Sequence, residues 1–537
     1  MNRPKFYVYL PIVFALILIA GIFIGNTFNF NKKEGGLSVG GNNKFSKIDE
    51  ILKYVSEEYV DTIKPEKLLD NTITAMLKNL DPHSSYIPKE ELAETTEPLQ
   101  GNFEGIGVEF NIVDDTIRVV SAIAGGPSET VGIQAGDAII MVDGKRVAGV
   151  KISNKGVMEK LKGKGGTKVK VGVMRRGKPK PLDFTITRGT IPIYSIDASY
   201  MVNKKTGYIK IARFAGTTYD EYMTAFKKLQ MQGMEKLIID LRGNGGGYLN
   251  TAVAIADEFL PEGKEIVYLQ GKARPRKDHI ATAKGDFEHG KLYVLIDDGS
   301  ASASEILAGA LQDNDRATII GRRSFGKGLV QEESDFPDGS AIRLTIARYY
   351  TPTGRCIQKS YAEGIDAYYD EEYNRYTNGE MENEDSVKVA DSLKFKTPLG
   401  KIVYGGGGIT PDVFVPVDTA GRSHYLSELI YSGIANDFAF NYADKNRKRL
   451  KEYKTAEKFN ADFEVSSELF DSFIDSAEKN AIKRNKKQIH SSEAIIKNQL
   501  KALIARSIWN SEGFYRVIQL QDNVLKKAVE LASEKSK

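Results

Sequence analysis

The stretch Gly299–Gln331, GSASASEILAGALQDNDRATIIGRRSFGKGLVQ, is the part of the chain that decides its fold and its chemistry. Small residues and serines precede a helical pattern at Glu305–Leu311, and a β-branched run at Ala317–Ile320 leads to a lysine between two glycines. A serine hydroxyl is a poor nucleophile at neutral pH, so it needs a base. Lys327 can act as that base if burial lowers its pKa, and the flanking glycines let the backbone pack closely around it.

Two other interpretations of this stretch stay open. Small residues such as those at Ser300–Ala303 also mark close backbone packing or a helix cap. Gly321–Lys327 has the G-x-x-x-x-G-K spacing of a phosphate-binding loop and follows a strand-like run. That loop requires a serine or threonine after the lysine and a helix that begins there, whereas Gly328 is followed by a strand-like pattern. The stretch therefore meets some, but not all, of the requirements of a P-loop nucleotide hydrolase.

The blocks SASASEILAGALQDNDRA and SFGKGLVQ resemble the signature of the C-terminal processing (tail-specific) peptidases, the serine–lysine proteases of family S41. The family separates its nucleophile and its general base by a fixed interval. Ser302 and Lys327, 25 positions apart, match that interval. The resemblance implies that Ser302 is the nucleophile, Lys327 the base and Gln331 the residue that orients the lysine. On a strand, Lys327 and Gln331 lie on the same face because they are four positions apart.

Other segments extend the resemblance beyond the serine and the lysine. LDPHSSYIPKEEL resembles an N-terminal element of the family, and GGGGITPDVFVPV resembles the segment that closes its core. The glycine-rich LRGNGGG loop implies an oxyanion hole, for which we predict the backbone amides of Gly246 and Ala303. A dinucleotide-binding loop is the alternative, but these glycines do not give G-x-G-x-x-G with an acidic residue at the required distance.

Residues 101–188 have a different pattern of short alternating runs with turn residues between them and a helical stretch near Val157–Lys162. Together with EGIGVEF and GPSETVGIQAGDAIIMVDGK, this pattern resembles a PDZ domain. The resemblance implies a turn whose backbone amides bind the carboxylate of a peptide terminus. The residues of that turn are Gly105, Ile106, Gly107 and Val108.

The composition is that of a globular protein with several domains: 537 residues, of which 41% are hydrophobic and 27% charged. The net charge of only +4 gives no reason to expect a nucleic-acid partner. Cys356 is the single cysteine, which rules out an internal disulfide. None of the five histidines has a partner at metal-ligand spacing, so we expect no metal site and no cofactor.

Tyr7–Gly25 is an uncharged apolar run about as long as a bilayer-spanning helix. No A-x-A cleavage site follows it and no cysteine stands nearby for lipidation, so we expect an uncleaved single-pass anchor. The charges on the two sides, Arg3 and Lys5 against Lys32 and Lys33, nearly balance and do not set the orientation. We expect the catalytic part to lie outside the cytoplasm, in the periplasm, anchored to the inner membrane of a bacterium.

Two parts of the chain lie outside the family pattern. The segment 363–396, rich in Asp, Glu, Tyr and Asn, replaces a short connection, and we expect it to be a surface excursion. Residues 418–537 are charged and amphipathic at helical spacing, with Trp509 the only tryptophan of the chain. Packing on the core, homodimerisation and adaptor binding are all open for this tail.

The expected fold is a multidomain α/β protein. It has a membrane anchor and linker (1–43), a helical segment (44–100), a PDZ domain (101–188), a mixed α/β serine–lysine protease core (189–417) and a helical extension (418–537). The expected function is that of a serine endopeptidase that recognises apolar C-terminal tails of protein substrates through its PDZ domain and cleaves through an acyl-enzyme. A non-catalytic PDZ scaffold is the alternative, but a scaffold needs no serine, lysine and glycine-rich loop at these intervals.

Overall fold

The computed structural model describes Ala15 and residues 46–123, 125–386 and 390–534. The chain forms two units, 1–76 and 77–537. The first contains α2 (Ser46–Glu58) and most of α3 (Pro65–Lys78), whose apolar residues recur at helical spacing. Apart from Ala15, the predicted anchor Tyr7–Gly25 lies outside the described residues. Of the helices in the described ranges, none has the length and the apolar composition needed to cross a bilayer.

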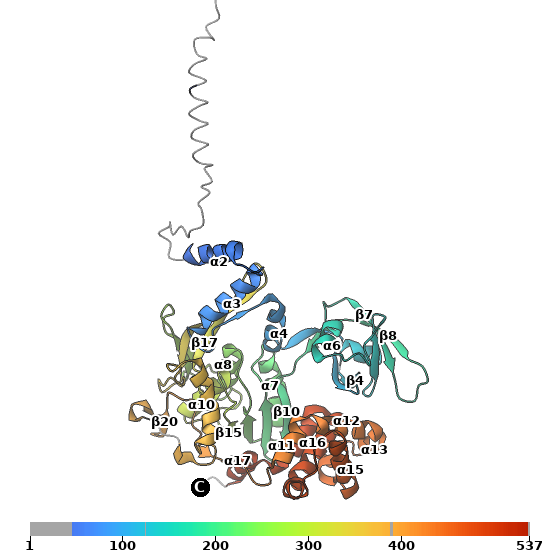
Figure 1. Cartoon of the computed structure of the whole chain (residues 1–537). Helices are drawn as coiled ribbons and strands as arrows, with labels where there is room; N and C mark the ends of the chain where they lie inside the picture. Colours follow the sequence, from blue (N-terminus) through green and yellow to red (C-terminus); the bar gives the residue numbers. More distant parts are fainter. Residues whose placement is uncertain (1–14, 16–45, 124, 387–389, 535–537) are drawn as a thin grey trace, which may run out of the picture. The chain divides into compact units, whose positions relative to one another are not determined.

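A six-stranded sheet forms the centre of the second unit (Figure 1). Only its first pair of strands is antiparallel; the others run parallel. In order across the sheet, the strands are β10 (Ile196–Met201), β11 (Thr206–Ile211), β12 (Lys236–Asp240), β15 (Lys291–Ile296), β16 (Thr318–Gly321) and β21 (Val413–Phe414). Because β12 and β15 are parallel neighbours, the glycine-rich loop after β12 and the serine turn after β15 begin at the same edge.

Each face of this sheet is covered by helices, since alternate side chains of a strand point to opposite faces. Ile239 and Val294 pack on one side in the same cluster as α7 (Thr218–Met231), α8 (Leu249–Asp257) and α9 (Ala303–Asp313). Ile238 and Leu295 pack on the other side, where they meet α17 (Asn523–Ser533) through Leu525 and its neighbours. Packing on the core, one of the roles left open for the C-terminal extension, is therefore present in the structure.

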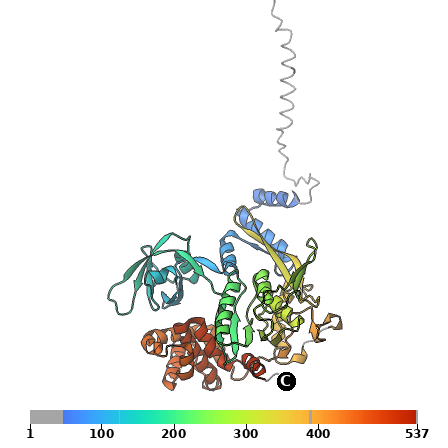
Figure 2. The ribbon, with the colours of Figure 1, turned by 180° about the vertical axis from the view of Figure 1, so that it is seen from behind.

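The rest of the extension is a helical bundle with its own core around Phe459, Phe473 and Ile504. In Figure 2, as in Figure 1, these helices gather in one group. They are α11 (His424–Tyr431), α12 (Ile434–Lys445), α13 (Arg447–Lys451), α14 (Ala456–Asp462), α15 (Ser467–Lys479) and α16 (Lys486–Ile518). The short η3 (Gln519–Gln521) connects α16 to α17.

A second, antiparallel sheet stands beside the serine turn. Its strands are β1 (Ser85–Ile87), β18 (Ala341–Tyr350), β13 (Glu265–Gln270), β14 (Lys277–Ile280) and β17 (Leu329–Asp335), which pairs with β18. Because β17 begins only at Leu329, Lys327 lies in the preceding loop, and a bulge falls between Val330 and Gln331. Lys327 and Gln331 therefore do not lie on one face of a strand, and this part of the sequence prediction is wrong.

The PDZ domain is built on a third sheet, with a core of alternating apolar residues around Ile117 and Val171. Its elements are β3 (Val108–Val113), β4 (Thr116–Ala122), α5 (Pro127–Thr130), β5 (Ala138–Val142), β6 (Lys145–Arg146), α6 (Asn154–Leu161), β7 (Lys168–Met174) and β8 (Leu182–Thr187). The strands β2 (Asn102–Gly105) and β9 (Gly189–Pro192) pair where the chain enters and leaves the domain.

Most of the described residues of the acidic insertion are exposed, as its composition predicts, but the insertion also has secondary structure and a buried face. It contains α10 (Ile365–Thr377), the short turns η1 (Glu384–Ser386) and η2 (Asp391–Leu393), and β19 (Lys394–Lys396), which pairs with β20 (Ile402–Tyr404). Tyr368 and Arg375 of α10 are each only 2% exposed. The Arg375 guanidinium donates to the carbonyls of Ser324 (2.8 Å) and Phe325 (3.0 Å), so one face of the helix packs against the loop that leads to Lys327.

Candidate active site

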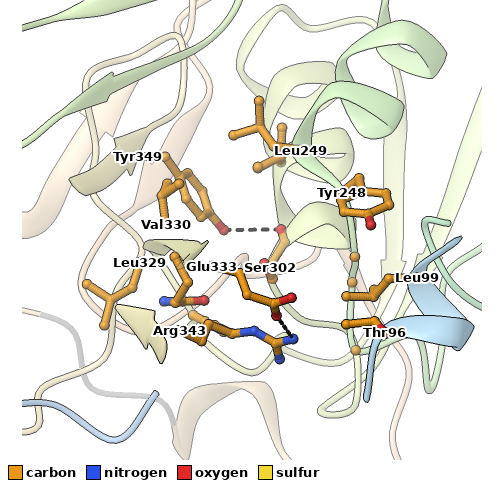
Figure 3. Close-up of a pocket in the computed structure, with 16 residues that line it drawn as sticks. Thr96, Leu99, Tyr248, Leu249, Ser302, Leu329, Val330, Glu333, Arg343 and Tyr349 are labelled. Atoms are coloured by element: carbon orange, nitrogen blue, oxygen red, sulfur yellow. Dashed lines mark hydrogen bonds and ion pairs between the residues drawn. The ribbon is translucent and has the colours of Figure 1, made fainter. Parts of the chain in front are cut away.

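Ser302 occupies a constrained turn between β15 and α9. Its backbone has φ 56° and ψ −113°, a conformation that a residue with a side chain rarely adopts. The Tyr349 hydroxyl donates to its carbonyl oxygen at 3.2 Å (Figure 3). The neighbouring serines have structural partners: Ser300 Oγ donates to the Leu241 carbonyl (2.9 Å) and Ser304 Oγ to the Asn244 carbonyl (2.8 Å). These bonds hold the turn on both sides of Ser302.

Ser302, Lys327 and Gln331 line one cavity of about 430 Å³. The structure thus brings together three residues that come from the α9 turn, the following loop and β17. Apolar and aromatic side chains make up much of the remaining lining, and they lie around Ser302 in Figure 3. They are Leu99, Tyr248, Leu249, Ile306, Leu329, Val330 and Tyr349. A cavity of this kind accepts an apolar side chain next to the serine.

The Lys327 amine has a pKa below its usual range. Burial is the main cause because it disfavours the charged ammonium, and the positive charge of Arg343 lowers the pKa further, against the attraction of Glu305 and Asp81. Arg343 itself pairs with Glu333 at 2.7 Å (Figure 3). At neutral pH a larger fraction of a lysine in this environment is neutral than of a lysine in water, so its amine can accept a proton.

His83, from the LDPHSSY segment, also faces this lysine. Burial and then the charge of Lys327 lower the pKa of His83 to about 4, so its ring is neutral at pH 7. Its Nε2 lies 2.8 Å from the Tyr368 hydroxyl of α10. The N-terminal segment and the insertion helix therefore meet beside the base.

Glu305 is a central residue of the site that sequence reasoning missed. It is fully buried, and Ser302 N–H (2.8 Å), Lys327 N–H (2.9 Å), Gly326 N–H (2.7 Å) and Ser324 Oγ (2.5 Å) all donate to its carboxyl group. Burial raises its pKa, while these hydrogen bonds act in the opposite direction. One carboxylate thus holds the backbone of the serine and of the lysine. The S-x-x-E spacing of a capping box was the available signal.

The glycine-rich loop lies directly against the serine. A Cβ on Gly246 would stand 2.8 Å from the Cβ of Ser302 and 2.9 Å from the N of Ala303, so only glycine fits there. As the first residue of α9, Ala303 has an N–H without an acceptor inside the helix. The Gly246 N–H donates to Asn244 Oδ1 at 2.9 Å, so an oxyanion would have to share this donor with Asn244.

A network of charged side chains anchors the beginning of this loop. Arg242 donates to the buried Asp240 (2.6 and 3.0 Å) and to Asp522, the N-cap residue of α17 (3.0 Å). Burial alone would raise the pKa of Asp240, but Arg242 and Lys210 hold it well below its usual range. The C-terminal extension therefore contacts the catalytic loop, a connection that nothing in the sequence pattern indicated.

The structure also bears on the alternatives. The residues after Lys327 continue into strand β17 and not into a helix, so the helix N-terminus of a phosphate-binding loop is missing at that place. Within the part of the chain that the structure describes, no group of three or more His, Cys, Asp or Glu side chains is arranged to hold a metal ion.

The predicted peptide-binding turn of the PDZ domain lies between β2 and β3. Gly107 has φ 72°, and Ile106, Gly107 and Val108 line a largely apolar cavity of about 300 Å³. Gly105 ends β2 outside this lining. Glu97 of α4 (Lys89–Gln100) and Lys162 also line this cavity, and they form an ion pair. This contact joins the PDZ groove to a helix whose Leu99 lines the Ser302 cavity.

A PDZ domain that precedes an α/β core with a constrained serine and a buried lysine in one cavity defines a PDZ-containing serine protease. The model of peptidase family S41 matches residues 205–368, and that of the PDZ domain matches 105–186. Two further models match: the N-terminal domain of the activating protease CtpB over 26–91, and a family of unknown function over 425–510. The chain belongs to peptidase family S41, among its carboxy-terminal processing serine proteases.

Two relatives known from their sequences support this membership over most of their length. The carboxy-terminal-processing protease of Bartonella bacilliformis is 36% identical over 354 residues, which cover 64% of this chain and 80% of the relative. Carboxy-terminal processing protease CtpB of Bacillus subtilis is 36% identical over 349 residues, covering 64% and 71%. Among solved structures, the photosystem II D1 C-terminal processing protease is 27% identical, with 70% and 87% covered and a TM-score of 0.36.

Proposed function

We propose that this protease cleaves proteins by a serine–lysine mechanism through an acyl-enzyme and that its PDZ domain recognises the C-terminal tail of the substrate. In the first step the neutral amine of Lys327 accepts the proton of Ser302 Oγ while the oxygen attacks the carbonyl carbon of the scissile peptide bond. The carbonyl π bond opens, and the negative charge moves to its oxygen. Gln331 orients the lysine.

The oxyanion meets the backbone N–H of Ala303 and, shared with Asn244, that of Gly246. When the tetrahedral intermediate collapses, the C–N bond breaks and the Lys327 ammonium gives its proton to the leaving amine. A water molecule then attacks the ester carbonyl of the acyl-enzyme, with Lys327 accepting the water proton. The ammonium returns this proton to Ser302 Oγ as the ester bond breaks, which releases the new carboxyl terminus.

One observation carries this mechanism: Ser302 and Lys327 line the same cavity, and a single buried carboxylate, Glu305, accepts hydrogen bonds from the backbone N–H groups of both. The lysine pKa is lowered by burial, as a neutral base requires. A non-catalytic PDZ scaffold has no need for such an arrangement.

The test is cleavage of an unstructured protein with an apolar C-terminus. Ser302→Ala should be inactive, and Lys327→Arg should be inactive as well because a guanidinium stays protonated. Ser334→Ala, at an exposed position of β17, should cut at the wild-type rate. Mass spectrometry of the quenched wild-type reaction should reveal an adduct on the peptide that contains Ser302. Cleavage by Ser302→Ala at the wild-type rate would refute the mechanism.

Tail recognition is supported by the apolar cavity beside Gly107 and Val108. An extended tail added along β3 would place its last side chain in that cavity and its carboxylate at the turn. A substrate with a free carboxyl terminus should be cut faster than the same chain with an amidated terminus. Equal rates would mean that the domain does not recognise the chain end.

We also propose that the uncharged run Tyr7–Gly25 anchors the protein in the inner membrane of a bacterium, with the protease in the periplasm. The proposal rests on the length and composition of this run. Fractionation of cells that produce the full chain should recover it with the membrane, whereas a chain that starts at residue 44 should be soluble. Externally added protease should degrade the catalytic part only after the outer membrane is opened.

A further inference from the structure

Gln331 is the end of a chain of hydrogen bonds that leads away from the cavity. Its Nε2 lies 3.2 Å from Thr345 Oγ1 of β18, and this hydroxyl donates to Asp81 Oδ1 at 3.1 Å. Asp81 and Thr345 belong to neither the predicted catalytic residues nor the lining of the cavity. The two residues are 264 positions apart in the sequence.

The backbone explains why these three side chains meet. The bulge between Val330 and Gln331 shifts the pairing of β17 with β18 so that Gln331 stands directly opposite Thr345. Strand β1 pairs with β18 from Ser85 onward, and the Thr345 N–H donates to Ser84 Oγ at 3.1 Å. The LDPHSSY segment is therefore fixed against the strand that holds Thr345.

Asp81 sets the direction of the hydrogen bonds that connect it to Gln331. It is 7% exposed, and it accepts hydrogen bonds from His83 N–H (2.8 Å), Ser84 N–H (2.8 Å) and Ser84 Oγ (2.6 Å). Burial alone would raise its pKa, but these bonds prevail and lower it, so Asp81 is ionised at neutral pH. An ionised carboxylate can only accept hydrogen bonds. The hydrogen of the Thr345 hydroxyl is thus committed to Asp81.

The orientation of the Gln331 amide follows. Because the Thr345 hydroxyl has a single hydrogen and gives it to Asp81, its oxygen can only accept from Gln331. The NH₂ end of the amide must point to Thr345, which leaves the carbonyl Oε1 as the other end. A flipped amide would direct its NH₂ group away from Thr345 and leave Oε1 against the hydroxyl oxygen, with no hydrogen between two acceptors.

We infer that Asp81 and Thr345 are positioning residues for the catalytic lysine, because they make Gln331 present its carbonyl oxygen to the Lys327 amine. This inference rests on the serine–lysine mechanism proposed above. A neutral amine has two N–H donors and one lone pair. When Gln331 Oε1 accepts one N–H, the lone pair is left for the Ser302 proton. An NH₂ group in its place would donate to the lone pair and compete with the serine.

The test distinguishes the effect of the Thr345 hydroxyl from the effect of the size of its side chain. Thr345→Val keeps the shape and removes the hydroxyl, whereas Thr345→Ser keeps the hydroxyl. We expect Thr345→Val to lower kcat at least about tenfold with KM within about twofold of the wild type, and Thr345→Ser to restore kcat to within about threefold. Thr185→Val, at an exposed strand position of the PDZ domain, controls for the substitution itself.

Asp81→Ala is the second variant, and it decides the matter if Thr345→Val does not fold. Asp81→Ala removes the acceptor of the Thr345 hydroxyl, which can then donate to Gln331 Oε1, so the Gln331 amide is no longer held in one orientation and kcat should again fall. Wild-type kcat in Thr345→Val or Asp81→Ala, or a Thr345→Ser variant as slow as Thr345→Val, would overturn the inference. Such results with an inactive Ser302→Ala variant would leave the serine–lysine mechanism standing, whereas an active Ser302→Ala variant would remove the mechanism itself.

Discussion

Glu305→Gln tests whether the buried carboxylate organises the site. A glutamine has the same shape but one acceptor and one donor end, so one pair of the present donors must face an NH₂ group. If that group faces Ser302 N–H and Lys327 N–H, two backbone bonds are lost. If it faces Gly326 N–H and Ser324 Oγ, only one backbone bond is lost because the serine oxygen can accept. The second orientation should therefore form.

The expected loss of stability follows from the number of backbone hydrogen bonds that are lost. A buried N–H left without an acceptor costs about 1 to 3 kcal/mol. Burial of the charge is unfavourable, as the raised pKa of Glu305 indicates. The uncharged glutamine avoids this penalty, which offsets part of the cost. We expect a net loss of about 1 to 2 kcal/mol in the free energy of unfolding. Since Gly326 precedes Lys327, the base loses one anchor, and kcat should fall about tenfold.

Urea unfolding and steady-state cleavage of the same preparations measure both effects. Glu332→Gln is the matched control because this glutamate is exposed on β17 and pairs with Arg274 at the surface. Its free energy of unfolding should change by less than about 0.5 kcal/mol. If Glu305→Gln matches this control in both stability and kcat, Glu305 does not hold the serine and the lysine together.

Three further predictions concern other parts of the molecule. Arg343→Gln removes a positive charge that lowers the pKa of Lys327; the neutral base then forms at higher pH, so the rising limb of kcat/KM against pH should move up by roughly 0.5 to 1 pH unit. Arg375→Met removes the donor to the carbonyls of Ser324 and Phe325 in the loop that leads to Lys327. It should lower the free energy of unfolding by about 3 kcal/mol and reduce kcat. Gly107→Val forces a β-branched residue to φ 72° with its Cβ 2.9 Å from Ile191 Cδ1, so KM should rise for substrates with a free tail but not for amidated ones.

The first two of these predictions have a control in the same element, and the third has one in the same domain. Arg348→Gln lies on the same strand as Arg343 but is exposed, and it should leave the pH profile in place. Tyr376→Phe, on the exposed side of α10, should leave kcat unchanged. Gly144→Val has the same positive φ (74°) as Gly107 but open space around its Cβ, so it should reproduce the backbone strain without the effect on KM.

Much of the site could be predicted from the sequence because its parts are local motifs. The serine turn, the lysine between two glycines and the glycine-rich loop each depend on a short run of residues, and parallel strands bring such runs to one edge of a sheet. Glu305 was within reach for the same reason, since its spacing from Ser302 is that of a capping box.

Composition accounts for the exposed part of the insertion after β18 but not for its buried face. An acidic, tyrosine-rich segment predicts a solvated surface, because an unpaired charge is costly to bury. Arg375 is nevertheless 2% exposed, since Glu371 neutralises it and the carbonyls of Ser324 and Phe325 accept hydrogen bonds from it. Glu371 lies on the same helix, but the two carbonyls lie on a different element, and periodicity does not contain that information.

The sequence by itself determined the family, the order of the elements, and the serine and lysine, because these depend on local patterns and fixed intervals. Only the tertiary structure decided which residues of distant segments support the serine, the lysine and the glycine-rich loop. The amphipathic stripe of α17 predicts a helix with a buried face, but any apolar surface would suit it, and only the fold places it on the sheet with Asp522 against Arg242. In the same way, Asp81 meets Thr345 across 264 positions because a strand pairing and a bulge, which no local pattern encodes, set their register.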